Sequence, residues 1–288
     1  MTAAEEGVLL LCCRLGDPNC KPLTMPQFRE LGQRVFPALA GKDPLRQLCS
    51  KDLTDLGYEP TRADEILRLL DRDELLVTYL RRAEEQNIHP ITRLSPNYPD
   101  RLRQTLGYRT PAVLFYRGDL TLLTKPSTAV VGSRQLNPEN RYFTEKIGKF
   151  LAQTEQVLVS GGAIGADQVV QNACISNGGQ AVIFVADRLT DHREEDRILH
   201  LSADGYDIPF ANYRALERNK LIHAGSEKAV AVQCTLGTGG TWQGCTENLK
   251  HQWSPLYMYQ DNSLAAAALV AKGAVPITEP AETERSTR

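Results

Sequence analysis

The chain has 288 residues, enough for one or two domains with a buried core. Its 33 Lys and Arg nearly balance its 35 Asp and Glu, and the net charge of -2 argues against a strongly basic nucleic-acid binder while permitting a local basic patch. No apolar run approaches the roughly 18–20 residues of a membrane span, and the N-terminus does not resemble a secretory signal. The seven cysteines lack C-x-x-C spacing, so we expect reduced thiols in a cytoplasmic protein.

Residues 1–86 are predicted to form a small helical domain. Apolar residues recur at helical spacing between short breaks such as Thr24-Met25-Pro26 and Leu56-Gly57-Tyr58. Short helices separated by glycine are typical of helix-hairpin-helix-like or SAM-like modules, and the turn of a helix-hairpin-helix can contact a DNA backbone. The alternative is a helical bundle with only a structural role, in packing and spacing.

Residues 87–278 are predicted to form an α/β domain, in which a bridge up to residue 126 leads into alternating strands and helices. The predicted strands are 127–131, 156–160, 180–186, 229–234, 255–259 and 274–277, and the predicted helices are 138–153, 166–176, 212–223, 241–250 and 263–272. This alternation favours a Rossmann-like, doubly wound and mostly parallel sheet with helices on both faces.

Two stretches are expected to lie outside this regular structure. The longest gap between predicted strands, Asp187–Phe210, is rich in charged residues and is expected to run over the surface. The tail of residues 279–288 is polar and charged, and is expected to be disordered.

Four features are expected at the carboxyl edge of the sheet, where ligands of open α/β sheets bind. They are Gly132-Ser133-Arg134, Ser160-Gly161-Gly162-Ala163-Ile164-Gly165-Ala166-Asp167, Arg218-Asn219-Lys220 and Gly239-Gly240-Thr241. The glycines allow a ligand to approach the backbone, and free N–H groups at helix starts attract anions. The guanidinium of Arg134 can hold a phosphate through two hydrogen bonds, and two cations flanking Asn219 would form a compact anion site. Asp167 would brace its turn, and Thr241 would cap a helix.

A dinucleotide site and a catalytic site are disfavoured. Ser160–Gly165 reads G-G-x-x-G and does not follow the first strand, although Asp187 lies where a ribose-binding acid would sit. The five histidines lack metal-ligand spacing, and neither a G-x-S-x-G elbow nor a Walker A motif occurs. We therefore expect no cofactor, no metal and no catalytic group.

In combination, these motifs resemble the DNA-processing protein A (DprA/Smf) family over residues 90–275. The matching segments are Tyr98–Leu102, Pro111–Leu120, Val130–Arg134, Val159–Asp167, Arg218–Ile222 and Gly273-Ala274. The resemblance implies a non-catalytic protein that binds single-stranded DNA, forms homodimers, protects incoming strands and helps to load the recombinase RecA during natural transformation. By position, it implies DNA contacts at Arg134, Ser160, Gly161, Gly165, Arg218 and Lys220.

The chain departs from the usual family pattern at three places. Ile164 stands where members usually have Arg, Gln171 where they usually have His, and Gly-Gly-Thr from Gly239 where they usually have Ser-Gly-Ser. The Gly239-Gly240-Thr241 sequence resembles the phosphoribosyl-binding loop of LOG-type nucleotide-binding proteins, and Glu247 follows this loop. One alternative is therefore a nucleotide-derivative sensor or hydrolase that uses the same pocket, and another is an interaction scaffold with a vestigial pocket. The hypotheses of DNA binding and of nucleotide binding both require Arg134, Gly162, Arg218 and Gly240 to meet at one edge of the sheet.

Overall fold

The computed structural model describes residues 1–38 and 48–284. Its contacts divide the chain into two compact units. The first comprises Met1–Tyr116 with Ser202–Ile208, and the second comprises Arg117–Leu201 with Pro209–Arg288. The predicted helical domain of residues 1–86 lies within the first unit. None of the helices in the described residues is long and apolar enough to cross a membrane.

The first unit is mainly helical. Its helices are α1 (Ala3–Cys12), α2 (Met25–Ala38), α3 (Ser50–Asp55), α4 (Pro60–Leu70), α5 (Asp73–Glu84), α6 (Asp100–Leu106) and the short 3-10 turn η1 (Gly107–Arg109), and its strands are β1 (His89–Thr92) and β2 (Val113–Arg117), which pair antiparallel. A reciprocal cap between Thr2 and Glu5 starts α1, and the apolar second half of α1 is buried. Arg72 donates hydrogen bonds to the carbonyl oxygens of Leu69 (3.0 Å) and Cys13 (3.0 Å), which ties α4 to the end of α1.

The second unit is a parallel sheet covered on both faces. Its strands are β3 (Ser127–Gly132), β4 (Val157–Ser160), β5 (Gln180–Phe184), β6 (Ile198–Ala203), β7 (Lys228–Gln233), β8 (Leu256–Tyr259) and β9 (Val275–Ile277), in the order β6-β5-β4-β3-β7-β8-β9. Its helices are α7 (Pro138–Gln153), α8 (Ala166–Ser176), α9 (Asn212–Ala224), α10 (Gly239–His251) and α11 (Leu264–Ala271), with 3-10 turns η2 (Leu120–Thr124), η3 (Leu189–Asp191) and η4 (Pro280–Glu284). Strands that are buried on both faces have continuous apolar sequences, which is why the sequence located each of these strands except β6.

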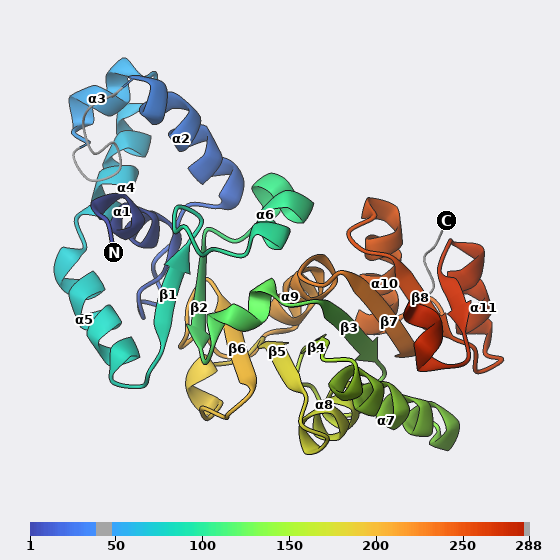
Figure 1. The fold of residues 1–288 in the computed structure, drawn as a ribbon. Helices are drawn as coiled ribbons and strands as arrows, with labels where there is room; N and C mark the ends of the chain where they lie inside the picture. Colours follow the sequence, from blue (N-terminus) through green and yellow to red (C-terminus); the bar gives the residue numbers. More distant parts are fainter. Residues whose placement is uncertain (39–47, 285–288) are drawn as a thin grey trace. The chain divides into compact units, whose positions relative to one another are not determined.

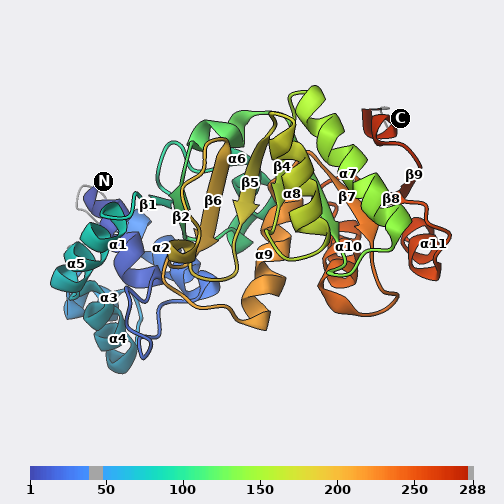
Figure 2. The same cartoon turned by 90° about the horizontal axis from the view of Figure 1, so that it is seen from below.

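The helices of this unit lie in two layers. Helices α7 and α8 pack together on one face of the sheet, and α9 and α10 pack together on the other (Figure 1; Figure 2 shows the same layers from below). The predicted doubly wound parallel sheet is confirmed.

The strand order creates one topological switch point. From the central strand β3 the chain moves outward through β4, β5 and β6, and it then returns to place β7 on the other side of β3. The helices that follow β3 and β7 therefore leave toward opposite faces, and a crevice opens between the two strand ends. Open α/β sheets bind ligands in such a crevice.

The prediction that Asp187–Phe210 runs over the surface is wrong for its middle part. Ile198–Ala203 form β6, which pairs parallel with β5 from Ala181 opposite Ile198 to Phe184 opposite Leu201. The strand was missed because the buried His200 interrupts its apolar run and charged residues precede it.

The buried His200 gives a testable pH dependence. Its side chain is 3% exposed, its Nδ1 has no hydrogen-bond partner, and its ring lies 5.2 Å from that of His192. Burial, followed by the charges of His192 and Arg117, lowers the pKa of His200 to about 4, and Asp187 opposes this shift. Because an unfolded histidine titrates near pH 6.5, only the unfolded state gains this proton as the pH falls from about 6.5 to about 4. We expect the free energy of unfolding to decline over that window in denaturant titrations.

The variant His200→Leu should show a shallower decline, because it removes the titrating group from β6. The comparison concerns the change with pH, so a lower absolute stability of the variant does not affect it. Parallel pH profiles for the two proteins would contradict the assignment.

The predicted disorder of residues 279–288 is wrong up to Glu284. Pro280–Glu284 form the turn η4, in which Pro280 and Thr283 are buried. Glu284 accepts a hydrogen bond from Lys228 Nζ (2.5 Å), and Glu279 pairs with Lys146 of α7 (2.5 Å). The polar composition suggested disorder because these cationic partners lie far away in sequence. Residues 285–288 lie outside the described residues.

Candidate functional site

The loops that follow β3 and β7 meet in a cleft at the switch point. Ser133 N–H donates to the carbonyl oxygen of Gln233 (2.9 Å), and Thr241 Oγ1 donates to the carbonyl oxygen of Gly132 (3.0 Å). The cleft has a volume of about 900 Å³ and is bounded by these two loops, the turn after β4 and one side of α9. The predicted site residues that line it are Gly132, Ser133, Arg134, Asp167, Arg218, Asn219, Gly239, Gly240 and Thr241.

Two glycines of the turn after β4 allow the backbone of Arg134 and the side chain of Arg218 to pack closely against this turn. Gly165 has a φ of +90°, and a Cβ placed there would lie 2.3 Å from the carbonyl oxygen of Arg134. A Cβ on Gly161 would lie 1.4 Å from Nη1 of Arg218. These glycines are needed because other chain segments occupy the space of a side chain.

Four predicted residues of this turn, Ser160, Gly161, Gly162 and Gly165, do not line the cleft. Ser160 is fully buried, and its Oγ donates to the carbonyl oxygen of Val130 (3.0 Å), so it links β4 to β3. Gly162 is exposed with a φ of +67° and shapes the turn. The implied contact between Ser160 and DNA is not supported, because its side chain is enclosed by the sheet.

Asp167 and Arg218 both line the cleft, and their opposite charges partly compensate each other. Asp167 is buried, and its carboxylate accepts a hydrogen bond from Ala163 N–H (3.3 Å). Burial raises the pKa of Asp167, and the nearby Arg218 guanidinium opposes that rise. Burial likewise lowers the pKa of Arg218, whose Nη1 donates to the carbonyl oxygen of Phe184 (3.1 Å). The role of Asp167 as a brace for this turn agrees with the prediction.

Arg134 is the cation most available to a ligand in the cleft. Its side chain is exposed, and it forms no ion pair with any residue that the structure describes. Its backbone is held on two sides, because Gly165 packs against it and Ala166 N–H donates to the neighbouring carbonyl oxygen of Ser133 (3.1 Å). The guanidinium is therefore free to bind while its loop is fixed.

The predicted set of Arg218, Asn219 and Lys220 is divided by the geometry of α9. Lys220 does not line the cleft and pairs with Glu217 (2.7 Å), because residues two apart on a helix point in different directions. Asn219 Nδ2 donates to the carbonyl oxygen of Gly240 (3.2 Å) and so joins α9 to the start of α10. The prediction of two cations flanking one amide in a single anion site is wrong.

The starts of two helices add positive potential to the cleft. Helix α8 begins after Gly165 and α10 after Thr238, and neither has a side-chain cap. At the start of α8, however, the N–H groups of Ala166 and Gln168 already donate to the carbonyl oxygens of Ser133 and Ala163. Thr241 was predicted as the cap of α10, but it lies inside the helix and bonds to Gly132. Uncapped N–H groups at a helix start favour an anion. Arg134, Arg218 and the start of α10 therefore outweigh the single carboxylate of Asp167.

Sequence reasoning missed the residue that holds the Arg134 loop. Gln233, the last residue of β7, accepts a hydrogen bond from Asn137 N–H at Oε1 (2.9 Å) and donates to the carbonyl oxygen of Gln135 (3.1 Å). Its one signal in the sequence is a polar side chain that ends an apolar strand. The apolar lining of the cleft was also missed; it consists of Leu136, Ile164, Leu216 and Ile222.

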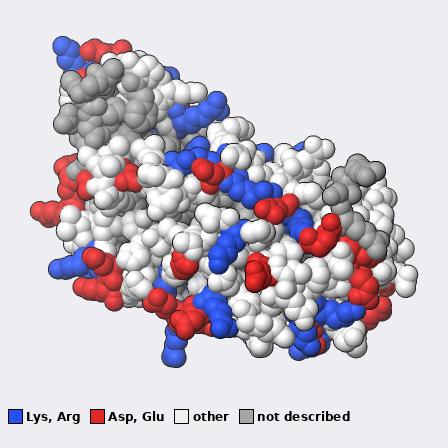
Figure 3. Space-filling view, in the orientation of Figure 1, with Lys and Arg blue, Asp and Glu red and all other residues white. Residues whose placement is uncertain are grey.

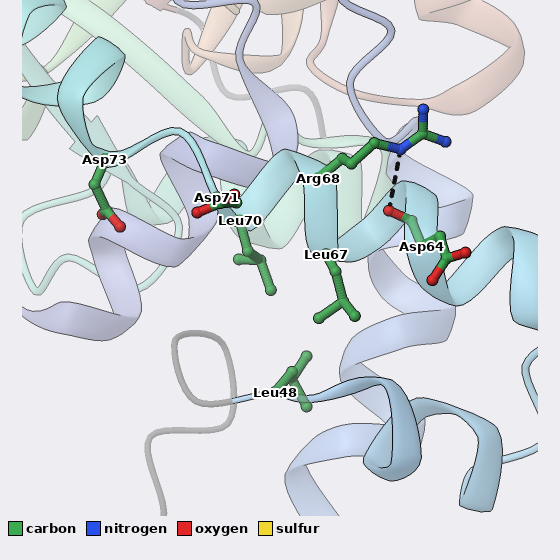
Figure 4. Close-up of a pocket in the computed structure, with 7 residues that line it drawn as sticks. All are labelled: Leu48, Asp64, Leu67, Arg68, Leu70, Asp71 and Asp73. Carbon is green, nitrogen blue, oxygen red and sulfur yellow. Dashed lines mark hydrogen bonds between the residues drawn. The ribbon is translucent and has the colours of Figure 1, made fainter.

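Another cleft lies in the first unit and has the opposite charge. It has a volume of about 660 Å³ and is lined by Leu48, Asp64, Leu67, Arg68, Leu70, Asp71 and Asp73 (Figure 4). Three carboxylates and one guanidinium make it unfavourable for a phosphate. The molecular face drawn in Figure 3 also mixes Lys and Arg with Asp and Glu, without a continuous basic surface. An anion site is therefore best placed in the cleft at the switch point.

Comparison with protein families identifies the family of this chain. The family model for DNA recombination-mediator protein A matches residues 89–286. The chain belongs to this family. The DNA processing protein DprA of Bacillus subtilis is 26% identical over 241 residues, which cover 80% of this chain and 76% of that protein. The recognition of the DprA/Smf family from the sequence is confirmed.

Two solved structures of the family share the fold. DNA processing protein A from Streptococcus pneumoniae aligns with a TM-score of 0.70 and 22% identity, covering 92% of this chain and 99% of that one. The protein from Helicobacter pylori, whose structure was solved for its single-stranded DNA binding mode, aligns with a TM-score of 0.57 and 22% identity, covering 68% of this chain and 93% of that one.

Proposed function

We propose that this member of the DNA recombination-mediator family binds single-stranded DNA without catalysis, through the cleft between β3 and β7. The observation that carries the proposal is the exposed Arg134, which lines the same cleft as the uncapped start of α10. A groove of amide and guanidinium groups binds phosphates without reading bases. The single-stranded DNA binding of the Helicobacter pylori relative supports the same role here.

A salt titration of oligonucleotide binding tests this proposal. Few cations line the cleft, so we expect one to three phosphates to be neutralised. The plot of log affinity against log salt should then have a slope between about -0.7 and -2, since each phosphate contributes about -0.7 for a single strand. Fluorescence anisotropy with a labelled poly-dT oligonucleotide measures this slope. Absence of binding at low salt, or a slope of zero, would refute the proposal.

The family further suggests what the bound strand is for. We propose that the chain acts as a homodimer in the cytoplasm, protects single strands and assists the loading of RecA during DNA uptake and recombination. A nuclease-protection assay and a RecA strand-exchange assay with this chain test these two activities separately. The dimer is tested by sedimentation velocity with and without oligonucleotide.

A nucleotide derivative is the second candidate ligand for the same cleft. The apolar side chains Ile164 and Leu216 favour it, because they could contact a base while the start of α10 binds a phosphate. Glu247, a possible acid for a hydrolase, does not line the cleft, so a sensor fits better than an enzyme. Thermal shift with a panel of mononucleotides tests this candidate. Strong stabilisation by a mononucleotide but not by an oligonucleotide would favour it over DNA binding.

A further inference from the structure

The exposed apolar side chains of the second unit share one location. Within the described parts of residues 117–201 and 209–284, every exposed large apolar side chain lies in the loop or the first two turns of helix that follow the carboxyl end of a strand. They are Tyr142 after β3, Ile164 after β4, Phe210 and Tyr213 after β6, Leu236 after β7 and Leu264 after β8. Single exposed hydrophobic residues such as Tyr142 and Leu264 need no explanation, whereas the two aromatic residues Phe210 and Tyr213 lie three positions apart just before the cleft-lining part of α9 and indicate a binding surface.

Phe210 and Tyr213 are held in place. They precede the part of α9 that lines the cleft. Arg214, which lies next to Tyr213, is buried and donates to the carbonyl oxygens of Pro209 (3.3 Å) and Ala186 (3.0 Å). Ala186 follows the end of β5, so these bonds fix the start of α9 over that strand end. Phe210, between Pro209 and the helix, is carried by the same anchored segment.

Tyr213 lies beside the cleft. It precedes Leu216, a lining residue, by three positions, and such residues are neighbours on one helix face. Two residues after Leu216, Arg218 also lines the cleft, and it is fixed to Phe184 at the end of β5. The residues Phe210 and Tyr213 are nevertheless 51% and 60% exposed, so they remain available to a partner.

Unpaired nucleobases are the occupants that best match these rings. A single strand offers flat apolar bases on one side of its backbone and phosphates on the other, whereas duplex DNA hides the bases. Anion-binding groups lie in the adjoining cleft, and the chain as a whole is slightly acidic. Affinity for a single strand therefore needs a contribution other than charge, and stacking of bases on aromatic rings supplies it.

We propose that Phe210 and Tyr213 form a base-stacking platform at the mouth of the cleft, which receives bases of the strand whose phosphates bind at Arg134 and the start of α10. This inference rests on the proposed binding of single-stranded DNA and identifies which of its groups the platform contacts. The platform makes recognition depend on unpaired bases.

The test compares two ligands of equal charge, a poly-dT oligonucleotide and an abasic oligonucleotide of the same length. The wild-type chain should prefer poly-dT. The variant Phe210→Ala, Tyr213→Ala should lose that preference, with poly-dT bound about 5- to 150-fold more weakly for each stacked base removed. The salt slope should stay unchanged, since stacking releases no counterions from phosphates.

Tyr142→Ala is the matched control, because Tyr142 is a similarly exposed tyrosine on α7, at the other face of the sheet. It should leave both affinities unchanged. Circular dichroism and thermal midpoints check that the variants are folded, and the single variants Phe210→Ala and Tyr213→Ala replace the double variant if it is not.

Each outcome separates this inference from the proposed function. If the wild-type chain binds both oligonucleotides equally, or the variants bind poly-dT as the wild type does, the platform is refuted while DNA binding stands. If the wild-type chain binds neither oligonucleotide, the proposed function itself fails. If the variants change only self-association in sedimentation velocity, the rings contact protein and the platform is refuted.

Discussion

Replacing Arg134 with glutamate is expected to weaken single-strand binding by roughly 10- to 150-fold, as the loss of a charge-assisted hydrogen bond of about 1.5–3 kcal/mol implies. The side chain is exposed at the cleft, while its backbone is fixed by Gly165 and the loop to Gln233. The substitution removes a guanidinium and adds a negative charge near the carboxylate of Asp167. Anisotropy at fixed salt measures the loss.

The control for this experiment is Lys149→Glu, which makes the same charge change on an exposed residue in the last turns of α7. It should leave binding within about twofold, since exposed charges separated by more than a Debye length of about 8–10 Å are screened. Arg134→Lys should bind with intermediate affinity, because lysine keeps the charge but loses the planar fork. Equal losses in Arg134→Glu and Lys149→Glu would show that only overall charge matters.

Thermal stability separates binding from folding in the Arg134 variant. Because Arg134 forms no ion pair with a described residue, Arg134→Glu should unfold within a few degrees of the wild type. A large drop in the thermal midpoint would mean that the side chain supports the fold, and the binding loss could then not be assigned to DNA contact.

Replacing Gly165 with alanine is expected to destabilise the chain and to abolish binding together. The residue has a φ of +90°, and an added Cβ would lie 2.3–2.5 Å from backbone atoms of Arg134. Backbone cannot move aside as a flexible side chain can, so the Arg134 loop or the turn after β4 must shift. Overpacking of this kind costs about 1–3 kcal/mol, in addition to roughly 1–2 kcal/mol for alanine at a left-handed φ.

Gly178→Ala isolates the steric part of that cost. Gly178 also has a positive φ, of +85°, but no atom lies within 4 Å of an added Cβ, so it shares the positive φ of Gly165 without the clash. Denaturant titrations should show Gly165→Ala less stable than Gly178→Ala by about 1–3 kcal/mol. Only Gly165→Ala should lose DNA binding. Equal stabilities for the two variants would mean that Arg134 does not need the close approach of Gly165.

Local patterns in the sequence were sufficient for the ligand edge of the sheet and for every strand of the second unit except β6. Apolar runs such as Val157–Ser160 predicted buried parallel strands, and glycines at their ends predicted tight turns at the carboxyl edge. The structure brings Arg134, Arg218 and Gly240 to one cleft, as predicted, but Gly162, the fourth residue of that prediction, does not line it. The DNA contacts assigned to these residues stay predictions.

Contacts between distant segments could not be predicted in this way. The separation of Arg218 from Lys220 depends on how α9 is rotated against β5, and the burial of Ser160 depends on its bond to Val130 in the neighbouring strand. Gln233 holds the Arg134 loop across about a hundred residues of sequence, and no local pattern records such a bond.

The sequence by itself determined the parallel α/β class, the family and the cationic, glycine-rich turns, because each depends on residue type and spacing over a few neighbours. Only the tertiary structure decided that the crevice at the switch point lies between β3 and β7, that β6 completes the sheet around a buried histidine, and that Phe210 and Tyr213 are exposed just before the cleft-lining part of α9. Strand order and helix rotation follow from packing among residues far apart in the chain, and that packing sets which of the conspicuous side chains face a ligand and which face the protein.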